Sequence, residues 1–127
     1  KINERFKFME GAPLIFTSAI TGYGIKKIIP SIINVRNEFN KKINPGDLNN
    51  LLLKCISENP LPRAGNRRPK IFKVSQTRVA PPTFSFESSN PKLIHFSYRR
   101  FLQNNIRKEF GFNGSPIVMN FNHKTNE

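Results

Sequence analysis

Beyond residue 41, the apolar residues of this sequence switch between the spacing of an α-helix and the spacing of a β-strand. The first apolar group recurs three and four residues apart, which places it on one face of a helix: Leu48, Leu51, Leu52, Cys55 and Ile56. Asn44 suits the N-cap of this helix, Pro45 its first position and acidic Asp47 its first turn. Pro60 disfavours helical backbone at the residue before it, so we expect one helix between Asn44 and Pro60.

Two segments with strand-like composition follow. Ile71 to about Val79 is expected to form a strand, which Ala80-Pro81-Pro82 should end. From Thr83 to Glu87 the residues alternate between apolar and polar, which places Phe84 and Phe86 on one face of a second strand.

A second helix and a third strand complete the pattern. The helix is expected to begin with Asn90 as its cap and Pro91 as its first residue, and to run to about Phe110. Its buried side should consist of Ile94, Tyr98, Phe101, Leu102 and Ile106. Ile117 to Phe121 is expected to form the last strand, and the tail from His123 to Glu127 to be frayed. The order α-β-β-α-β predicts an α+β domain with a three-stranded sheet and two helices on one face, although the pattern does not say which face is covered.

Residues 1–41 have a different organisation. Leu14-Ile15-Phe16-Thr17 is a short apolar run of the kind found as a buried strand in parallel sheets. A loop with two glycines follows, and residues 25–39 have the apolar spacing of an amphipathic helix, which Pro30 should kink or start late. Strand, loop and helix make half of a parallel α/β unit, so we interpret this part as the edge of a larger domain.

The positive charge of the chain is large and unevenly placed. The formal net charge is +13 and the isoelectric point is about 10.5, as expected of a nucleic-acid-binding protein. Residues 1–40 have six Lys and Arg against three Asp and Glu, whereas residues 41–127 have fifteen against five. A polyanionic partner is therefore expected to contact the second part of the chain.

A membrane or secretory role is not expected. No stretch approaches the ~20 apolar residues needed to span a bilayer. Lys1 to Glu10 lacks the apolar core of a secretory signal, and the single cysteine, Cys55, cannot form an internal disulfide. These features favour a cytoplasmic protein.

Catalytic machinery is not evident in the sequence. The one Asp and seven Glu are scattered, and Cys55, His95 and His123 make no plausible zinc set, so we expect no catalytic and no metal-binding residues. Cys55 lies on the apolar helix stripe and is interpreted as a core residue, and His95 as a surface or packing residue. The chain has no Gly-x-x-x-x-Gly-Lys-Ser/Thr loop, and Asn40-Lys41-Lys42-Ile43 lacks the Asp of Asn-Lys-x-Asp. We therefore expect the chain by itself not to be an enzyme.

Two parts of the sequence resemble one protein family. Residues 12–22, Ala-Pro-Leu-Ile-Phe-Thr-Ser-Ala-Ile-Thr-Gly, resemble the last guanine-contacting motif of translation-type GTPases. Three later motifs resemble the C-terminal KH-like domain of the bacterial tandem GTPase family Der, also called EngA: Pro81-Pro82-Thr83-Phe84, Ser97-Tyr98-Arg99-Arg100-Phe101-Leu102 and Phe110-Gly111-Phe112-Asn113-Gly114-Ser115-Pro116-Ile117. Their order and spacing fit this family from Ala12 to about Phe121.

The resemblance implies a division of the chain and a set of partners. Residues 1–41 would be the C-terminal end of the second GTPase domain, and residues 42–127 the KH-like domain. Intact members of the family bind GTP or GDP with Mg²⁺ and act in assembly of the large (50S) ribosomal subunit. Ser18 and Ala19 match the turn that contacts guanine in the intact protein, whereas this chain alone is expected to hold no cofactor. The expected partners are ribosomal RNA, the large subunit and the GTPase domains of the same protein.

The sequence departs from the family pattern in its strands. Val118 and Asn122 stand where many relatives carry Arg, which makes the last strand less basic. Ser85 and Glu87 replace apolar residues, which makes one face of the sheet more polar.

Candidate RNA-binding residues fall into two groups. One is a cationic run on and beside the first strand: Arg63, Arg67, Arg68, Lys70 and Lys73. The other is on the second helix: Arg99, Arg100, Arg107 and Lys108. For each group the alternative is an ordinary solvated surface. Residues 111–114 read Gly-x-x-Gly, but a strand follows them instead of a helix, so we interpret Gly111 as a helix C-cap with Phe112 packing back on the helix, rather than as an RNA clamp.

Two functions are consistent with these features. The first is an RNA-binding KH-like module of a ribosome-assembly GTPase, with contacts mainly to phosphate and shape. The second is an intramolecular regulatory module that docks on the GTPase domains and couples nucleotide state to ribosome binding.

Overall fold

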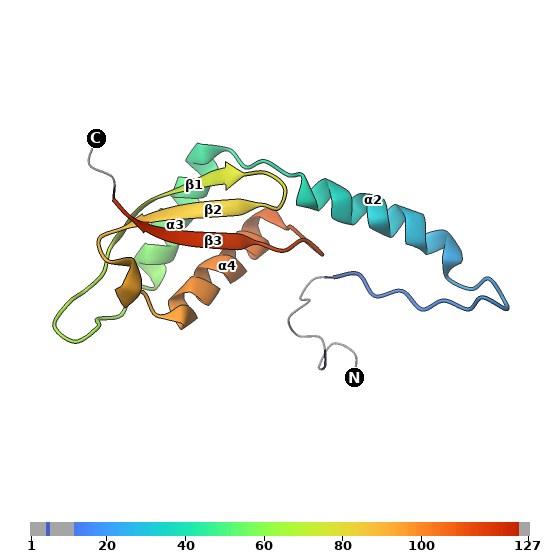
Figure 1. Ribbon diagram of the computed structural model, residues 1–127, viewed down its shortest axis with the longest axis horizontal. Helices are drawn as coiled ribbons and strands as arrows, with labels where there is room; N and C mark the ends of the chain where they lie inside the picture. The colour runs from blue at the N-terminus through green and yellow to red at the C-terminus, as the bar shows by residue number, and fades with distance from the viewer. Residues whose placement is uncertain (1–4, 6–11, 125–127) are drawn as a thin grey trace.

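Figure 1 shows the computed structural model, which describes residue 5 and residues 12–124. The described part contains three α-helices, two 3₁₀ turns and three strands: η2 (Ile25–Lys27), α2 (Ile28–Phe39), α3 (Pro45–Glu58), β1 (Ile71–Arg78), β2 (Thr83–Ser88), η3 (Pro91–Leu93), α4 (Phe96–Phe110) and β3 (Val118–His123). After residue 41 the order is the predicted α-β-β-α-β.

The three strands of the described region form one mixed sheet in the order β1-β2-β3. β1 pairs with β2 antiparallel, and β3 pairs with β2 in parallel after the chain crosses over through α4. In Figure 1, α3 and α4 both lie behind the sheet and leave its other face open. The predicted α+β architecture, with helices on one face, is confirmed.

The core lies between the sheet and these two helices. Phe84 and Phe86 of β2 are both fully buried, as their alternation predicted, and the ring of Phe86 stacks on Phe121 with centroids 4.7 Å apart. The apolar faces of α3 and α4 supply the other wall, with Leu48, Leu51, Leu52, Cys55, Tyr98, Leu102 and Ile106 all buried. Each such side chain contributes about 1.5–3 kcal/mol when it leaves water completely.

Helix α3 is capped and tied to the sheet by asparagines. The side chain of Asn44 accepts from the backbone N of Gly46 at 2.8 Å and of Asp47 at 3.4 Å, which confirms the predicted N-cap. Asn49 bonds both the N and the O of Val74 at the free edge of β1, at 3.1 and 3.0 Å. This pair of bonds satisfies backbone groups that an edge strand leaves unpaired.

The expectation of one helix beginning at Pro91 is wrong, because non-helical residues separate η3 from α4. Ile94 adopts extended backbone, which buries its side chain, and α4 begins at Phe96. His95 is the N-cap of α4, since its Nδ1 accepts from the backbone N of Ser97 at 3.1 Å. Asn90, the expected cap, makes no capping bond with its side chain. The helix is interrupted because extended backbone at Ile94 allows this side chain to be buried in the core.

The expected strand at residues 14–17 is also not formed. Leu14 and Phe16 are exposed, and no described segment pairs with them. A strand needs a neighbouring strand for its backbone hydrogen bonds, and in the described residues the sheet consists of β1, β2 and β3. Residues 1–4 and 6–11, the start of the proposed GTPase fragment, and residues 125–127 of the expected frayed tail lie outside the described residues.

The segment from residue 18 to residue 39 follows the prediction more closely. η2 precedes α2, so Pro30 falls in the first turn of the α-helix, where its missing N–H costs little, and the predicted late start is confirmed. Gly24 has φ +75°, and a Cβ there would lie 2.0 Å from the carbonyl O of Phe16, so only glycine fits this turn. Of the helices described, none is long and apolar enough to cross a membrane.

Candidate nucleic-acid interface

The loop from residue 59 to residue 70 carries exposed cations on an ordered backbone. Its two ends are held by the buried side chains of Leu61 and Pro69. Its tip is closed by a turn in which Ala64 N donates to Arg67 O at 2.8 Å and Arg67 N donates to Ala64 O at 3.2 Å. Four cations of the loop, all predicted to face RNA, are exposed: Arg63, Arg67, Arg68 and Lys70. The hydrogen-bonded turn therefore fixes the backbone that carries these four cations.

This loop is fastened to one end of the sheet. Lys70 N donates to Ser89 Oγ, and Ser89 N donates to Lys70 O, both at 2.9 Å. Two further exposed lysines lie at the same end: Lys73 in β1, and Lys124, whose backbone N donates to Ser88 O at 3.1 Å. We call the six residues Arg63, Arg67, Arg68, Lys70, Lys73 and Lys124 the basic end of the sheet. In Figure 1 it lies opposite the end to which α2 is attached.

The sequence prediction missed Lys124, because residues 123–127 were interpreted as a frayed tail. In the structure His123 pairs with Ser88 as the last residue of β3, which fixes the position of the following lysine. The signal was the alternation of Met119 and Phe121 within the predicted strand, which His123 continues beyond its predicted end.

The four predicted cations of the second helix divide into two kinds. Arg99 donates to Pro91 O at 2.8 Å and to Ile94 O at 3.3 Å, and its guanidinium lies 4.4 Å from the centroid of the Phe121 ring. Arg107 donates to Phe112 O and to Ser115 O, both at 3.0 Å. These two arginines therefore stabilise the fold, by joining η3 to α4 and by holding the turn after α4. Arg100 and Lys108 are exposed on α4, one of the two helices behind the sheet.

The open face of the sheet is polar. Because Phe84 and Phe86 point into the core, the alternating residues Ser85 and Glu87 point to the open face. Asn122 Nδ2 donates to Ser85 Oγ at 2.8 Å, and Asn120 is paired with Ser85 in register. The two polar residues of β2, Ser85 and Glu87, therefore lie on the face that solvent reaches.

The Gly-x-x-Gly segment is a helix C-cap, as predicted. Gly111 has φ +94°, a conformation that favours glycine, and its N donates to Arg107 O at 2.8 Å. Phe112 is fully buried, and its ring meets Phe84 edge-on with centroids 5.9 Å apart. The segment therefore ends α4 and closes the core with the Phe112 side chain.

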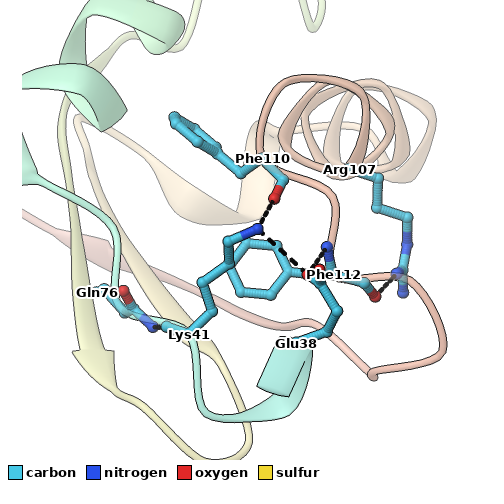
Figure 2. Close-up of polar contacts among 6 residues, drawn as sticks. All are labelled: Glu38, Lys41, Gln76, Arg107, Phe110 and Phe112. Carbon is cyan, nitrogen blue, oxygen red and sulfur yellow. Dashed lines mark hydrogen bonds and ion pairs between the residues drawn. The ribbon is translucent and has the colours of Figure 1, made fainter. Parts of the chain in front are cut away.

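The same turn is bonded to the end of α2, as Figure 2 shows. Glu38 Oε2 accepts from Phe112 N at 2.7 Å and from Lys41 Nζ at 3.3 Å, and Lys41 Nζ also donates to Phe110 O, at the C-terminal end of α4. Gln76 of β1 accepts from Ile43 N at 2.8 Å and donates to Lys41 O at 2.9 Å. We call Glu38, Lys41 and Gln76, with their partners, the latch. It joins α2 to both layers of the domain.

The predicted guanine-contacting turn is a closed loop in the structure. Gly22 N donates to Ser18 O at 2.8 Å, and Ser18 N donates to Tyr23 O at 3.0 Å. Ser18 is half-buried and Ala19 is exposed at the tip. The turn can offer backbone groups to a ligand.

The buried titratable groups belong to the core. Burial raises the pKa of the Cys55 thiol, and nearby Glu58 raises it further, so the thiol stays protonated and the interpretation of Cys55 as a core residue is confirmed. Burial also raises the pKa of Tyr98 to about 12, and its hydroxyl donates to Asn59 O at 2.8 Å. Within residues 12–124 no three His, Cys, Asp or Glu side chains gather where they could hold a metal ion.

Comparisons with known proteins agree with this architecture. The family model described as the KH-domain-like C-terminal part of EngA bacterial GTPases matches residues 42–122. A protein named GTPase Der from Caldanaerobacter subterraneus subsp. tengcongensis is 43% identical over 118 residues, which cover 93% of this chain and 27% of the relative. GTPase Der of Thermomicrobium roseum is 40% identical over 95% of this chain and 26% of the relative, and that of Clostridium acetobutylicum is 40% identical over 96% and 28%. The chain thus spans a little over a quarter of the length of these curated relatives.

Proposed function

The chain belongs to the KH-domain-like family of EngA bacterial GTPases, and on this premise we propose that it binds RNA through the basic end of its sheet. In this proposal it is a module of a cytoplasmic ribosome-assembly GTPase and contributes to large-subunit biogenesis through contacts with ribosomal RNA. Binding of GTP or GDP with Mg²⁺, and its hydrolysis, would belong to the intact protein, in which Ser18 and Ala19 would contact guanine.

One observation carries the proposal: six exposed cations gather at one end of the sheet, and one acidic residue of β2, Glu87, is paired in register with one of them, Lys73. The segment from residue 59 to residue 73 contains no acidic residue. The single ion pair recorded within the described residues is Lys41 with Glu38, at the other end of the sheet. Exposed cations on a fixed surface attract phosphates and release their counterions, which is the main source of nucleic-acid affinity.

The surface is suited to phosphate and shape more than to sequence. Its cations extend from a loop and two strand ends, and the Gly-x-x-Gly segment that could have clamped a backbone is a helix cap instead. Contacts of this kind position an RNA without reading its bases.

The first test is the salt dependence of RNA binding by the whole chain. If all six cations contact phosphates, the plot of log K against log salt should have a slope of roughly −4 for single-stranded RNA and −5 for a duplex. Fluorescence anisotropy with a labelled RNA between about 50 and 300 mM KCl measures the slope. An affinity that does not change with salt, or no binding at the lowest salt, would remove the proposal.

The latch favours a second function, in which the domain couples nucleotide state to ribosome binding. α2 is bonded to the C-terminal end of α4 and to the turn after it. Its Ile29, Ile32 and Ile33 are exposed, as on a helix that packs against a further layer of a protein. In this proposal residues 1–41 complete a GTPase domain in the intact protein, and a movement of α2 with nucleotide state is transmitted through the latch.

Glu38→Ala tests the latch. The substitution leaves the buried Phe112 N without its acceptor, so we expect the free energy of unfolding to fall by about 1–3 kcal/mol. In the intact protein it should also remove the difference in RNA affinity between the GTP and GDP states. Glu38→Gln, which keeps an acceptor oxygen, is the matched control and should retain most of both. Equal RNA affinity of the wild-type chain and of the intact protein in both nucleotide states would exclude the coupling.

A further inference from the structure

The open face of the sheet displays one exposed aromatic ring, that of Phe72, beside the basic end. We propose that Phe72 is a stacking platform for an unpaired RNA base, with Lys73 and Lys124 binding the phosphates on either side. The inference rests on the proposed RNA binding, and it adds the class of RNA: single-stranded rather than duplex.

A β-bulge places this ring outside. Ile71 pairs with Ser88 and Lys73 pairs with Glu87, so Phe72 is an extra residue in β1. Ile71 and Val74 are both buried, and without the extra residue the alternation could not put both of them in the core. The bulge therefore allows Phe72 and Lys73, two consecutive residues, to lie on the open face, where Phe72 is 46% exposed and Lys73 is paired in register with Glu87.

Lys124 marks the position of the platform. Its Nζ lies 5.0 Å from the centroid of the Phe72 ring. Phe72 is in β1 and Lys124 follows β3, so their contact spans β2 at the end of the sheet to which the loop is fastened. An aromatic face flanked by cations is the arrangement with which single-strand-binding proteins hold a base and its phosphates.

Polar side chains on the rest of the open face can form hydrogen bonds with unpaired bases. Ser75, Ser85, Asn120 and Asn122 supply hydroxyl and amide groups along the strands. Bases in a duplex are stacked on one another and cannot reach Phe72, whereas bases in loops and single strands can. Phe96 is even more exposed, at 71%, but it lies at the start of α4 beside the His95 ring and away from the open face, so it is a matched exposed aromatic outside the platform.

The test uses the whole chain and an oligouridine that contains one central 2-aminopurine, whose fluorescence changes when it stacks. Wild-type chain should bind this probe and change its emission. Phe72→Leu should weaken binding of the probe by about tenfold, remove the emission change, and leave the salt slope and the affinity for duplex RNA unchanged. Phe96→Leu should alter none of these, and Phe72→Tyr, which keeps the ring, should behave as wild type.

The outcomes separate this inference from the function on which it rests. If the wild-type chain binds the probe with the expected salt slope and Phe72→Leu binds it equally well, the platform is wrong and RNA binding stands. If the wild-type chain binds neither the probe nor the duplex at low salt, the proposed function fails. Circular dichroism checks that the Leu variant is folded. If it is not, Lys124→Gln with the same probe takes its place: a loss of affinity for the probe that exceeds the loss for the duplex supports the platform, and an equal loss overturns it.

Discussion

Replacing Phe112 with alanine should lower the free energy of unfolding by about 3–5 kcal/mol, the largest effect on stability that we expect from a single substitution in this chain. Phe112 is fully buried, and its ring meets Phe84 at the centre of the core. Truncation removes the burial of the ring and leaves a cavity that the surrounding strands and helices can fill only in part.

The position of Phe112 adds to this effect. Its carbonyl accepts from Arg107 and its N donates to Glu38, so the residue sits where α4, the turn after it and α2 meet. Figure 2 shows these bonds around the Phe112 backbone. Urea unfolding followed by circular dichroism measures the loss, and Phe96→Ala, at an exposed ring, is the control with an expected change below about 0.5 kcal/mol. A loss below about 1 kcal/mol for Phe112→Ala would show that the core closes without this ring.

Most of the elements could be predicted because their signals are local. The Asn44-Pro45 start of α3 and its apolar stripe all lie within one short segment, and the alternation of Phe84 and Phe86 depends on three consecutive positions. The break between η3 and α4 could not be predicted in this way. It exists because Ile94 reaches the core from extended backbone, and because Arg99 bonds the carbonyls of Pro91 and Ile94 that the break leaves free. The failed prediction for residues 14–17 has the same origin, since a strand depends on a partner elsewhere in the chain.

The candidate site could be predicted only in part, since the surroundings of a cation depend on tertiary contacts. The loop cations and Lys73 were found from charge alone and are exposed. Arg99 and Arg107 have the same charge but are bonded to backbone carbonyls, and only Arg107 had a local signal, four residues before the C-cap Gly111. Phe72 was missed because the bulge that turns it outward is a property of the pairing with β2.

Neutralising four cations of the basic end should reduce RNA affinity by roughly 10²-fold at about 0.15 M salt, the largest effect on function that we expect. The variant combines Arg67→Gln, Arg68→Gln, Lys70→Gln and Lys73→Gln. Each phosphate contact to a single strand contributes about 0.7 to the salt slope, so four lost contacts lower log K by about 2 at this salt concentration. The slope itself should become shallower by about 3.

Net charge alone predicts the same loss wherever the four cations are removed, whereas the basic end predicts a loss that depends on position. A control variant distinguishes these two explanations. It removes the same number of positive charges from exposed positions on η2, α2 and α3: Lys26→Gln, Lys27→Gln, Arg36→Gln and Lys54→Gln. Because the helices with these residues lie away from the open face, the control should lose less than about fivefold, through long-range attraction only. Equal losses of RNA affinity in the two variants would mean that RNA binding depends on the total charge of the chain. The basic end would then not be the binding surface.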